Sequence, residues 1–338
     1  MNSQSLPVAR KGIHGVLPVD KPAGLTSHDV VARVRRILGV RKVGHSGTLD
    51  PLATGLLVLC VGGATRFASY LTSQDKTYRA RILLGASTTT DDAEGEVLFR
   101  YSGDLEHLVT RQSLQEAIDS LAGEVMQRPP LYSSKKIGGV PAYRLARRGE
   151  TPDLSPVPVR IEPVQVLEVR LPEIELEFTC SAGTYLRAFA RDLGSKLECG
   201  GHLKQLVRKR SGGLGLDEAC TLDEICRAGR EGIKNELLLP VGKCLTWMPA
   251  VSLDSRAMES IYHGRTVGPD GASGGFSLED GQETGNGRGE KISLGKHEVR
   301  MLARPGGSFL GIGLLEVLGA NAVSLRPKRL MIEEFPFG

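Results

Sequence analysis

The segment EIELEFTC, residues 173–180, alternates strictly between apolar and polar side chains. A period of two predicts a strand with one buried face. The apolar face consists of Ile174, Leu176, Phe178 and Cys180. KTYRARILLG, residues 76–85, alternates in the same way and carries Tyr78 on its apolar face. Half-buried strands of this kind favour an antiparallel or mixed sheet over a doubly wound parallel one.

Two helices are predicted between such strands. TSHDVVARVRRILG, residues 26–39, has an apolar stripe, with Thr26 or Ser27 as its cap and Gly39 as its end. SLQEAIDSLAG, residues 113–123, has the capping-box spacing of Ser113 and Glu116. Because strands and helices mix without a regular β-α-β rhythm, the predicted fold class is α+β with a mixed or antiparallel central sheet.

The composition changes near residue 245. Residues 268–291 are rich in Gly, Ser and acidic residues, which is typical of a loop. Strand-like segments flank this loop, namely AVSLD, SFLGIGLLEV and NAVSLRPKRLMIEEF. We therefore expect one large domain over residues 1–247 and a small β-rich domain over residues 248–338, with a Gly-rich insertion at 268–291.

The cysteine pattern and the N-terminal residues both favour a cytoplasmic protein. None of the 6 cysteines belongs to a CxxC pair, so we expect free thiols in a reducing environment and no zinc site. The first residues, MNSQSLPVARKGIHG, lack the apolar core of a signal peptide, and no apolar run is long enough for a membrane span. A cytoplasmic protein is expected.

The stretch GHSGTLDPLATG, residues 44–55, places Asp50 between glycines, small hydroxyl residues and Pro51, ahead of an apolar strand. An Asp before Pro commonly starts a turn, and this is the more frequent meaning of such a pattern. A carboxylate on a loop at a strand end is also typical of a catalytic group. The residues alone leave both interpretations open. GxSxG, HExxH, Walker A and GxGxxG motifs are missing, which favours chemistry without a cofactor, or none.

Basic residues gather in three stretches without acidic residues, at 33–42, 135–148 and 204–210. Each could be a solvated helix face. The net charge is only +4, however, so positive charge is segregated along the chain. Together with Tyr132 and Tyr143, such charge suits a phosphate backbone and stacked bases. A nucleic-acid partner is predicted.

Five blocks, in order over about residues 15–212, resemble the motifs of the TruB family of pseudouridine synthases. The blocks are LPVDKPAGLTS, GHSGTLDPLATGLLVLCVGGATR, DKTYRARILLGASTTTDDAEGE, PPLYSSKKIGGVPAYRLARRGE and CSAGTYLRAFARDLG. RPKRLMIEEF, near the C-terminus, resembles the end of a PUA-type RNA-binding domain. The resemblance implies that the chain isomerises uridine 55 in the T loop of tRNA by flipping the base out, with no cofactor or metal.

The resemblance also implies roles for individual residues. Asp50 would be the essential carboxylate, Tyr78 would pack on the base and help to remove the carbon-5 proton, and Arg187 would pair with Asp50. The residues expected to bind the substrate are Lys21, His45, Lys135, Arg144, Tyr185, Leu203 and Arg208. From pattern alone, Tyr78 could be a core tyrosine and Arg187 an exposed helical arginine. A turn histidine bonded to the backbone is the corresponding alternative for His45.

Three other functions stay open from the sequence. They are a guide-RNA-dependent (H/ACA) pseudouridine synthase, a non-catalytic tRNA-binding or folding protein, and a nucleoside-cleaving hydrolase. The intact set of Asp50, Tyr78 and Arg187 favours a catalyst. The expected partner is the T arm of tRNA, and we expect a monomer without an obligate protein partner.

Overall fold

The structure is a computed structural model that describes residues 12–133, 135–150, 152–268, 275–278, 294–304, 306–319 and 322–331. The Gly-rich insertion predicted at 268–291 lies largely outside these ranges. Within it, residue 268 and residues 275–278 are described.

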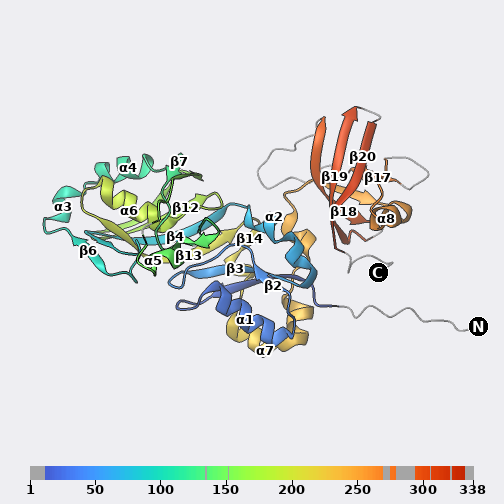
Figure 1. Cartoon of the computed structure of the whole chain (residues 1–338), viewed down its shortest axis with the longest axis horizontal. Helices are drawn as coiled ribbons and strands as arrows, with labels where there is room; N and C mark the ends of the chain where they lie inside the picture. The colour runs from blue at the N-terminus through green and yellow to red at the C-terminus, as the bar shows by residue number, and fades with distance from the viewer. Residues whose placement is uncertain are drawn as a thin grey trace, which may run out of the picture.

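An 11-stranded sheet forms the centre of the molecule, with the path β15-β1-β3-β13-β4-β12-β10-β7 and with β11, β14 and β2 attached (Figure 1). Its strands are β1 (Gly15–Lys21), β2 (Val43–His45), β3 (Thr54–Val61), β4 (Lys76–Leu84), β7 (Gly123–Gln127), β10 (Val157–Ile161), β11 (Gln165–Arg170), β12 (Glu173–Cys180), β13 (Gly201–Ser211), β14 (Leu214–Gly215) and β15 (Cys220–Thr221). Only the β1–β15 and β3–β13 pairs are parallel among the described strands of this sheet. The predicted α+β class with a mixed sheet is confirmed.

Helices lie against the sheet and at its ends. They are α1 (Ser27–Leu38), α2 (Ala68–Thr72), α3 (Leu105–Leu108), α4 (Arg111–Asp119), α5 (Ala142–Ala146), α6 (Leu186–Lys196), α7 (Leu222–Gly232) and α8 (Ser255–Tyr262). Helix α1 begins and ends as predicted, because Thr26 and Asp29 form a capping box and Gly39 takes the left-handed conformation at φ 62°. For α4 the predicted cap is wrong. Thr110 is the cap and Ser113 is its reciprocal partner three residues later, so the helix starts earlier than expected.

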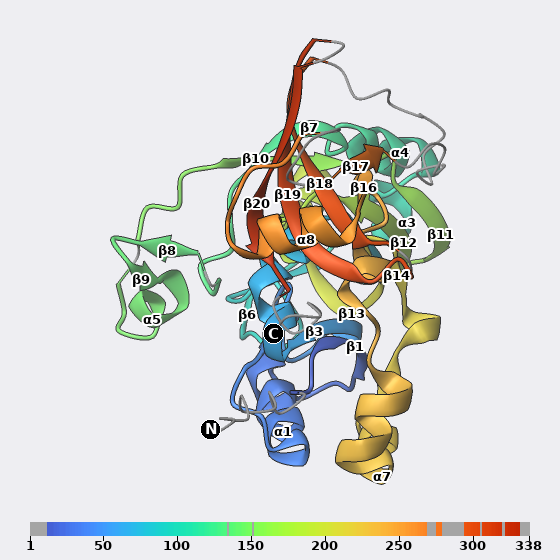
Figure 2. The same ribbon diagram turned by 90° about the vertical axis from the view of Figure 1, so that its right-hand side faces the viewer.

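Two short hairpins extend from the central sheet. One pairs β5 (Ala86–Thr88) with β6 (Val97–Arg100), and the other pairs β8 (Lys136–Ile137) with β9 (Val140–Pro141). The second hairpin and α5 form a lobe that stands apart from the body of the molecule (Figure 2).

A second sheet of five strands has the order β17-β16-β18-β19-β20 (Figure 1). Its strands are β16 (Ala250–Leu253), β17 (Phe276–Leu278), β18 (Gly295–Ala303), β19 (Phe309–Gly319) and β20 (Ala322–Leu330). The three strand-like segments predicted from the sequence are β16, β19 and β20. Strand β18 and helix α8 were not predicted.

The two sheets share a hydrophobic cluster. Val16, Leu56 and Phe67 from the first part of the chain pack with Phe309 and Ile312 from the second sheet. The rings of Phe67 and Phe309 meet edge to face, with centroids 5.3 Å apart. A β-rich C-terminal unit is thus present, while the predicted boundary between residues 247 and 248 stays a prediction.

Candidate active site

Asp50 lies in the loop between β2 and β3, and its backbone and side chain do different things. The backbone makes a turn, in which Ala53 N donates to Asp50 O at 3.1 Å. The carboxylate instead meets Arg187, whose Nε lies 2.9 Å from Asp50 Oδ2. The Asp50 side chain is 38% exposed, so a substrate can reach it. The turn predicted for this stretch is therefore present, and the carboxylate remains accessible, while its catalytic role stays a prediction.

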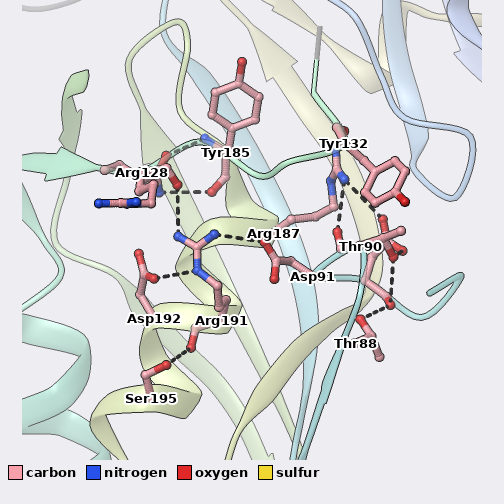
Figure 3. A network of polar contacts seen from close by, with 12 residues as sticks. Thr88, Thr90, Asp91, Arg128, Tyr132, Tyr185, Arg187, Arg191, Asp192 and Ser195 are labelled. Atoms are coloured by element: carbon pink, nitrogen blue, oxygen red, sulfur yellow. Dashed lines mark hydrogen bonds and ion pairs between the residues drawn. The ribbon is translucent and has the colours of Figure 1, made fainter. Parts of the chain in front are cut away.

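Arg187, at the start of α6, uses all three guanidinium nitrogens in contacts with oxygen atoms. Its Nη1 donates to Thr90 O at 3.1 Å and its Nη2 to Tyr132 O at 2.9 Å (Figure 3). A second carboxylate oxygen, Asp92 Oδ2, lies 3.6 Å from Nη1. The planar guanidinium is therefore fixed in orientation, and the carboxylate of Asp50 with it. The alternative of an exposed helical arginine is wrong, since the Arg187 side chain is buried.

The acidic turn between β5 and β6 supplies two of these contacts and was not predicted to do so. Asp92 Oδ1 accepts from Thr90 Oγ1 at 2.5 Å and from Glu94 N at 3.0 Å. These bonds close the turn and direct Thr90 O toward Arg187. A buried Asp that bonds to a hydroxyl two residues back is typical of such turns, and this local pattern was the available signal.

The structure places Leu203, on β13, in the interior, which argues against the predicted contact with the substrate. Its side chain is fully buried in the main hydrophobic core. Its backbone holds the acidic turn instead, because Leu203 N donates to Asp91 O at 3.0 Å and Leu203 O accepts from Ala93 N at 2.9 Å.

Tyr78 on β4 is half-buried, packs against the main core and lies beside Arg208. Burial raises the pKa of its hydroxyl, Arg208 opposes the rise, and the negative charge of Asp50 adds to it. The ring fits the alternative of a core tyrosine, since it packs against the main core. A role of the hydroxyl at the Asp50 site stays a prediction.

Arg208 on β13 lies beneath the Asp50 loop. Its Nε donates to Leu56 O at 2.6 Å, its Nη2 to Gly47 O at 3.1 Å and its Nη1 to Thr48 O at 3.4 Å. The side chain is 1% exposed. Burial leaves this guanidinium no surface to offer a substrate, and its bonds instead hold the Asp50 loop and the start of β3.

Lys21 at the end of β1 is also fully buried rather than on the surface. Its Nζ donates to Leu25 O at 2.7 Å, Pro22 O at 2.9 Å and Pro51 O at 3.3 Å. Burial lowers the pKa of Lys21 to about 8, and the Asp50 carboxylate opposes this shift. Lys21 thus joins the turn after β1 to the turn that carries Asp50, which corrects its expected role in substrate binding.

His45 and Tyr185 lie at two other edges of the site. Nδ1 of His45 is buried without a hydrogen-bond partner among the described residues, and its ring meets that of His28 edge to face at 5.4 Å. Burial lowers the pKa of His45. Tyr185 precedes α6, and the amide of Gln127 bonds to both its N–H and its C=O, at 2.8 and 3.0 Å. Burial raises the pKa of the Tyr185 hydroxyl.

Lys135 and Arg144 lie on the lobe formed by β8, β9 and α5. Lys135 O accepts from Ala142 N at 2.8 Å, which closes the lobe at its base. The guanidiniums of Arg144 and Arg147 lie over the Tyr143 ring, at 5.9 and 5.7 Å from its centroid. The structure does not bring this basic cluster into contact with Asp50. It does connect the cluster to the site, because the chain leading into the lobe carries the Tyr132 carbonyl bound by Arg187.

The structure provides a carboxylate oriented by Arg187, a half-buried tyrosine on β4 and, apart from them, an exposed basic lobe. The carboxylate can act as a nucleophile or as a base, and the phenol can pack on a planar ring. Within the described part of the chain, no group of three or more His, Cys, Asp or Glu residues could hold a metal ion. No described helix is both long and apolar enough to span a membrane.

Known proteins resemble the chain over most of its length. Residues 35–186 match the model of the TruB family pseudouridylate synthase N-terminal domain. The chain is 44% identical to tRNA pseudouridine synthase B of Mycobacteroides abscessus over 274 residues, which are 80% of this chain and 89% of that protein. It is 44% identical to tRNA pseudouridine synthase B of Cupriavidus metallidurans over 262 residues, which are 76% and 81% of the two chains.

Solved structures share the fold at low sequence identity. A chain in an H/ACA RNP bound to a substrate RNA containing 2'-deoxyuridine superposes with a TM-score of 0.70 and 22% identity, over 98% of this chain and 89% of that one. A chain in an archaeal box H/ACA sRNP complex gives a TM-score of 0.68 and 21% identity, over 98% and 90%. The likeness extends over the second sheet as well as the first.

Proposed function

The chain belongs to the TruB family of pseudouridine synthases, and from this membership and the Asp50 site we propose that it converts uridine 55 in the T loop of tRNA to pseudouridine. The protein is a tRNA pseudouridine synthase, an isomerase, as its 44% identical relatives are named. The position in the tRNA and the role of each residue are proposals. The observation that carries them is the 2.9 Å contact between Asp50 and Arg187 in an accessible loop.

The reaction moves one bond and leaves the composition of the RNA unchanged. The bond between ribose carbon 1′ and uracil nitrogen 1 breaks, the ring turns, and carbon 5 bonds to carbon 1′. Carbon 5 then loses its proton and nitrogen 1 gains one. Asp50 either attacks carbon 1′ or removes a ribose proton to form a glycal, and both routes use a carboxylate fixed by Arg187.

Tyr78 and the residues around the site would hold the base during this step. The Tyr78 ring would pack on the uracil and assist loss of the carbon-5 proton. His45 and Tyr185 would contact the flipped nucleotide and its neighbours. Extruding a base costs about a few kcal/mol, which contacts from basic side chains such as Lys135 and Arg144 to phosphates would offset. The second sheet would serve as a PUA-like RNA-binding unit.

The same reasoning extends to the cellular setting. We expect the protein to act in the cytoplasm, as a monomer and without an obligate protein partner. Its likeness to chains of H/ACA complexes makes a guide-dependent reaction the second candidate. A reaction on tRNA alone, with neither guide RNA nor added protein, separates the two.

The test uses unmodified tRNA transcript labelled with tritium at carbon 5 of uridine. We expect the wild-type protein to release tritium, retain the base as pseudouridine at one T-loop position, and yield no free uracil. Asp50→Asn should release none while still binding the tRNA. Asp119→Asn, on the exposed face of α4, is the matched control and should behave as wild type. Tight binding without release by the wild type would leave a binding protein or a guide-dependent enzyme, and free uracil would indicate a hydrolase.

A further inference from the structure

Helix α6 presents a second arginine, Arg191, one turn after Arg187 on the same face. Arg191 Nη1 lies 2.9 Å from Asp91 Oδ2, and its Nη2 donates to Arg128 O at 2.9 Å (Figure 3). Its Nε lies 2.9 Å from Asp192 Oδ1. The reaction proposed above uses Arg187 but gives Arg191 no part.

The two arginines hold the same two segments. Arg187 binds the acidic turn at Thr90 O and the segment after β7 at Tyr132 O. Arg191 binds the acidic turn at the Asp91 carboxylate and the segment after β7 at Arg128 O. The two arginines differ in their nearest carboxylate, which is Asp91 of the turn for Arg191 and Asp50 for Arg187.

Asp91 pairs with the Arg191 guanidinium and has little freedom to move. Its side chain is 15% exposed, and its backbone is left-handed at φ 61°. The bond from Leu203 N to Asp91 O holds that backbone in place. Burial raises the pKa of Asp91, and the positive charges of Arg191 and then Arg187 oppose the rise. Arg187 also lies near Asp91 in the structure, because its Nη1 binds the carbonyl of Thr90, the residue directly before Asp91.

The site thus contains carboxylates that can compete for one guanidinium. Arg187 already divides its donors between Asp50 at 2.9 Å and the more distant Asp92 at 3.6 Å. An unpaired carboxylate at Asp91 would add a further attraction, in a poorly exposed place where water screens it weakly. Such a pull would draw Arg187 away from the orientation that presents Asp50.

We propose that Arg191 is a positioning residue for the isomerisation: by pairing with Asp91, it keeps Arg187 directed at Asp50. The inference rests on the proposed function, because the orientation of Asp50 matters only if its carboxylate reacts. It predicts that the charge of Arg191, more than its bond to Arg128 O, is what the reaction needs.

The test compares Arg191→Gln, Arg191→Lys and the double variant Asp91→Asn/Arg191→Gln, with Asp91→Asn completing the cycle. Gln can still donate hydrogen bonds but carries no charge, whereas Lys keeps the charge without the planar fork. Arg230→Ala is the matched control, because Arg230 donates to Leu38 O, at the end of α1 and away from the site. For each protein, kcat and KM for the labelled tRNA are measured, together with the urea midpoint of unfolding.

We expect Arg191→Gln to lower kcat by about tenfold or more with little change in KM, within the range of measured couplings between neighbouring groups. The double variant should recover most of that loss, because it removes the competing charge, and Arg191→Lys should retain most of kcat. Arg230→Ala should keep the wild-type kcat.

Two results would overturn the inference. One is a wild-type kcat for Arg191→Gln, and the other is a double variant as slow as Arg191→Gln. The second would show that the contacts of Arg191 with Arg128 O or Asp192, and not the charge of Asp91, are what matter. If the wild-type protein itself formed no pseudouridine, the proposed function would fail instead, so the two failures are distinguishable.

Discussion

Replacing Arg208 by methionine tests whether this arginine holds the catalytic loop or grips the RNA. In the structure its guanidinium is buried beneath the loop and bonds to three backbone carbonyls. Arg208→Met keeps most of the volume of the side chain but removes every donor. The carbonyls of Leu56 and Gly47 would then lose a charged partner.

The expected loss of stability follows from these bonds. The contacts at 2.6 and 3.1 Å have good hydrogen-bond lengths, whereas the one at 3.4 Å is too long to add much. Bonds to a charged group contribute about 1.5–3 kcal/mol each, so the two amount to about 3–6 kcal/mol. Because a buried charge costs free energy of desolvation, removing the guanidinium offsets part of this loss of stability. A net loss of about 2–4 kcal/mol in the free energy of unfolding remains, which a domain stable by about 5–15 kcal/mol survives.

Urea unfolding and single-turnover tritium release measure the two consequences. We expect Arg208→Met to unfold at lower urea with an unchanged m value, and to react more slowly because the Asp50 loop is less well held. Arg208→Lys should fall between it and the wild type. Lys209→Met, at the exposed neighbouring position on β13, is the control for lost charge and should leave stability unchanged.

A different pattern would refute this reasoning. If Arg208→Met unfolded at the wild-type midpoint but bound tRNA more weakly, with a salt dependence reduced by about one phosphate contact, Arg208 would grip the RNA.

Four further substitutions have defined outcomes. Thr26→Ala removes the cap of α1 and should cost about 1 kcal/mol in urea unfolding without altering tritium release. Gly55→Ala should lower both stability and rate, since φ is 91° and the new Cβ would lie 2.5 Å from Arg208 O; a wild-type midpoint would contradict it. Tyr78→Phe keeps the ring but loses the hydroxyl, so tritium release should slow while tRNA affinity, measured by filter binding, holds. His45→Phe tests whether protonation of His45 is linked to folding. Burial lowers the pKa of His45 in the folded state, so below about pH 6.5 the unfolded state binds more protons. The wild type should therefore lose stability as pH falls from about 6.5 to about 5.5, and the variant should lose less.

The elements that depend on near neighbours could be predicted well. Strand β12 and its buried face follow from alternation alone, and α1 follows from Thr26, its apolar stripe and Gly39. The cap of α4 shows the limit of such patterns. Thr110 and Ser113 can both cap a helix, and the choice depends on where the preceding chain arrives.

The burial of Lys21 and Arg208 could not be predicted from the sequence, for a physical reason. Lysines and arginines are usually solvated, so Lys21, in a motif that resembles the family's, and Arg208, in a basic run, were expected to meet the RNA. Each is buried because backbone carbonyls converge on it, and for Arg208 these belong to a loop more than 150 positions away in sequence. A linear pattern does not report which distant carbonyls converge on a charge.

The local sequence therefore predicted which residue types lie at the site, but not the geometry in which they lie. Asp50 in its small-residue loop, Tyr78 on an alternating strand and Arg187 at the start of a helix were singled out through the resemblance of their motifs to the family, since the pattern alone left other meanings open. The packing of α6 against the acidic turn and the segment after β7 decided the rest. It buries Arg187, orients it with Thr90, Asp92 and Tyr132, and pairs Arg191 with Asp91. Charges and carbonyls far apart in sequence acquire their strength only when the fold removes them from water and sets them at hydrogen-bond distance.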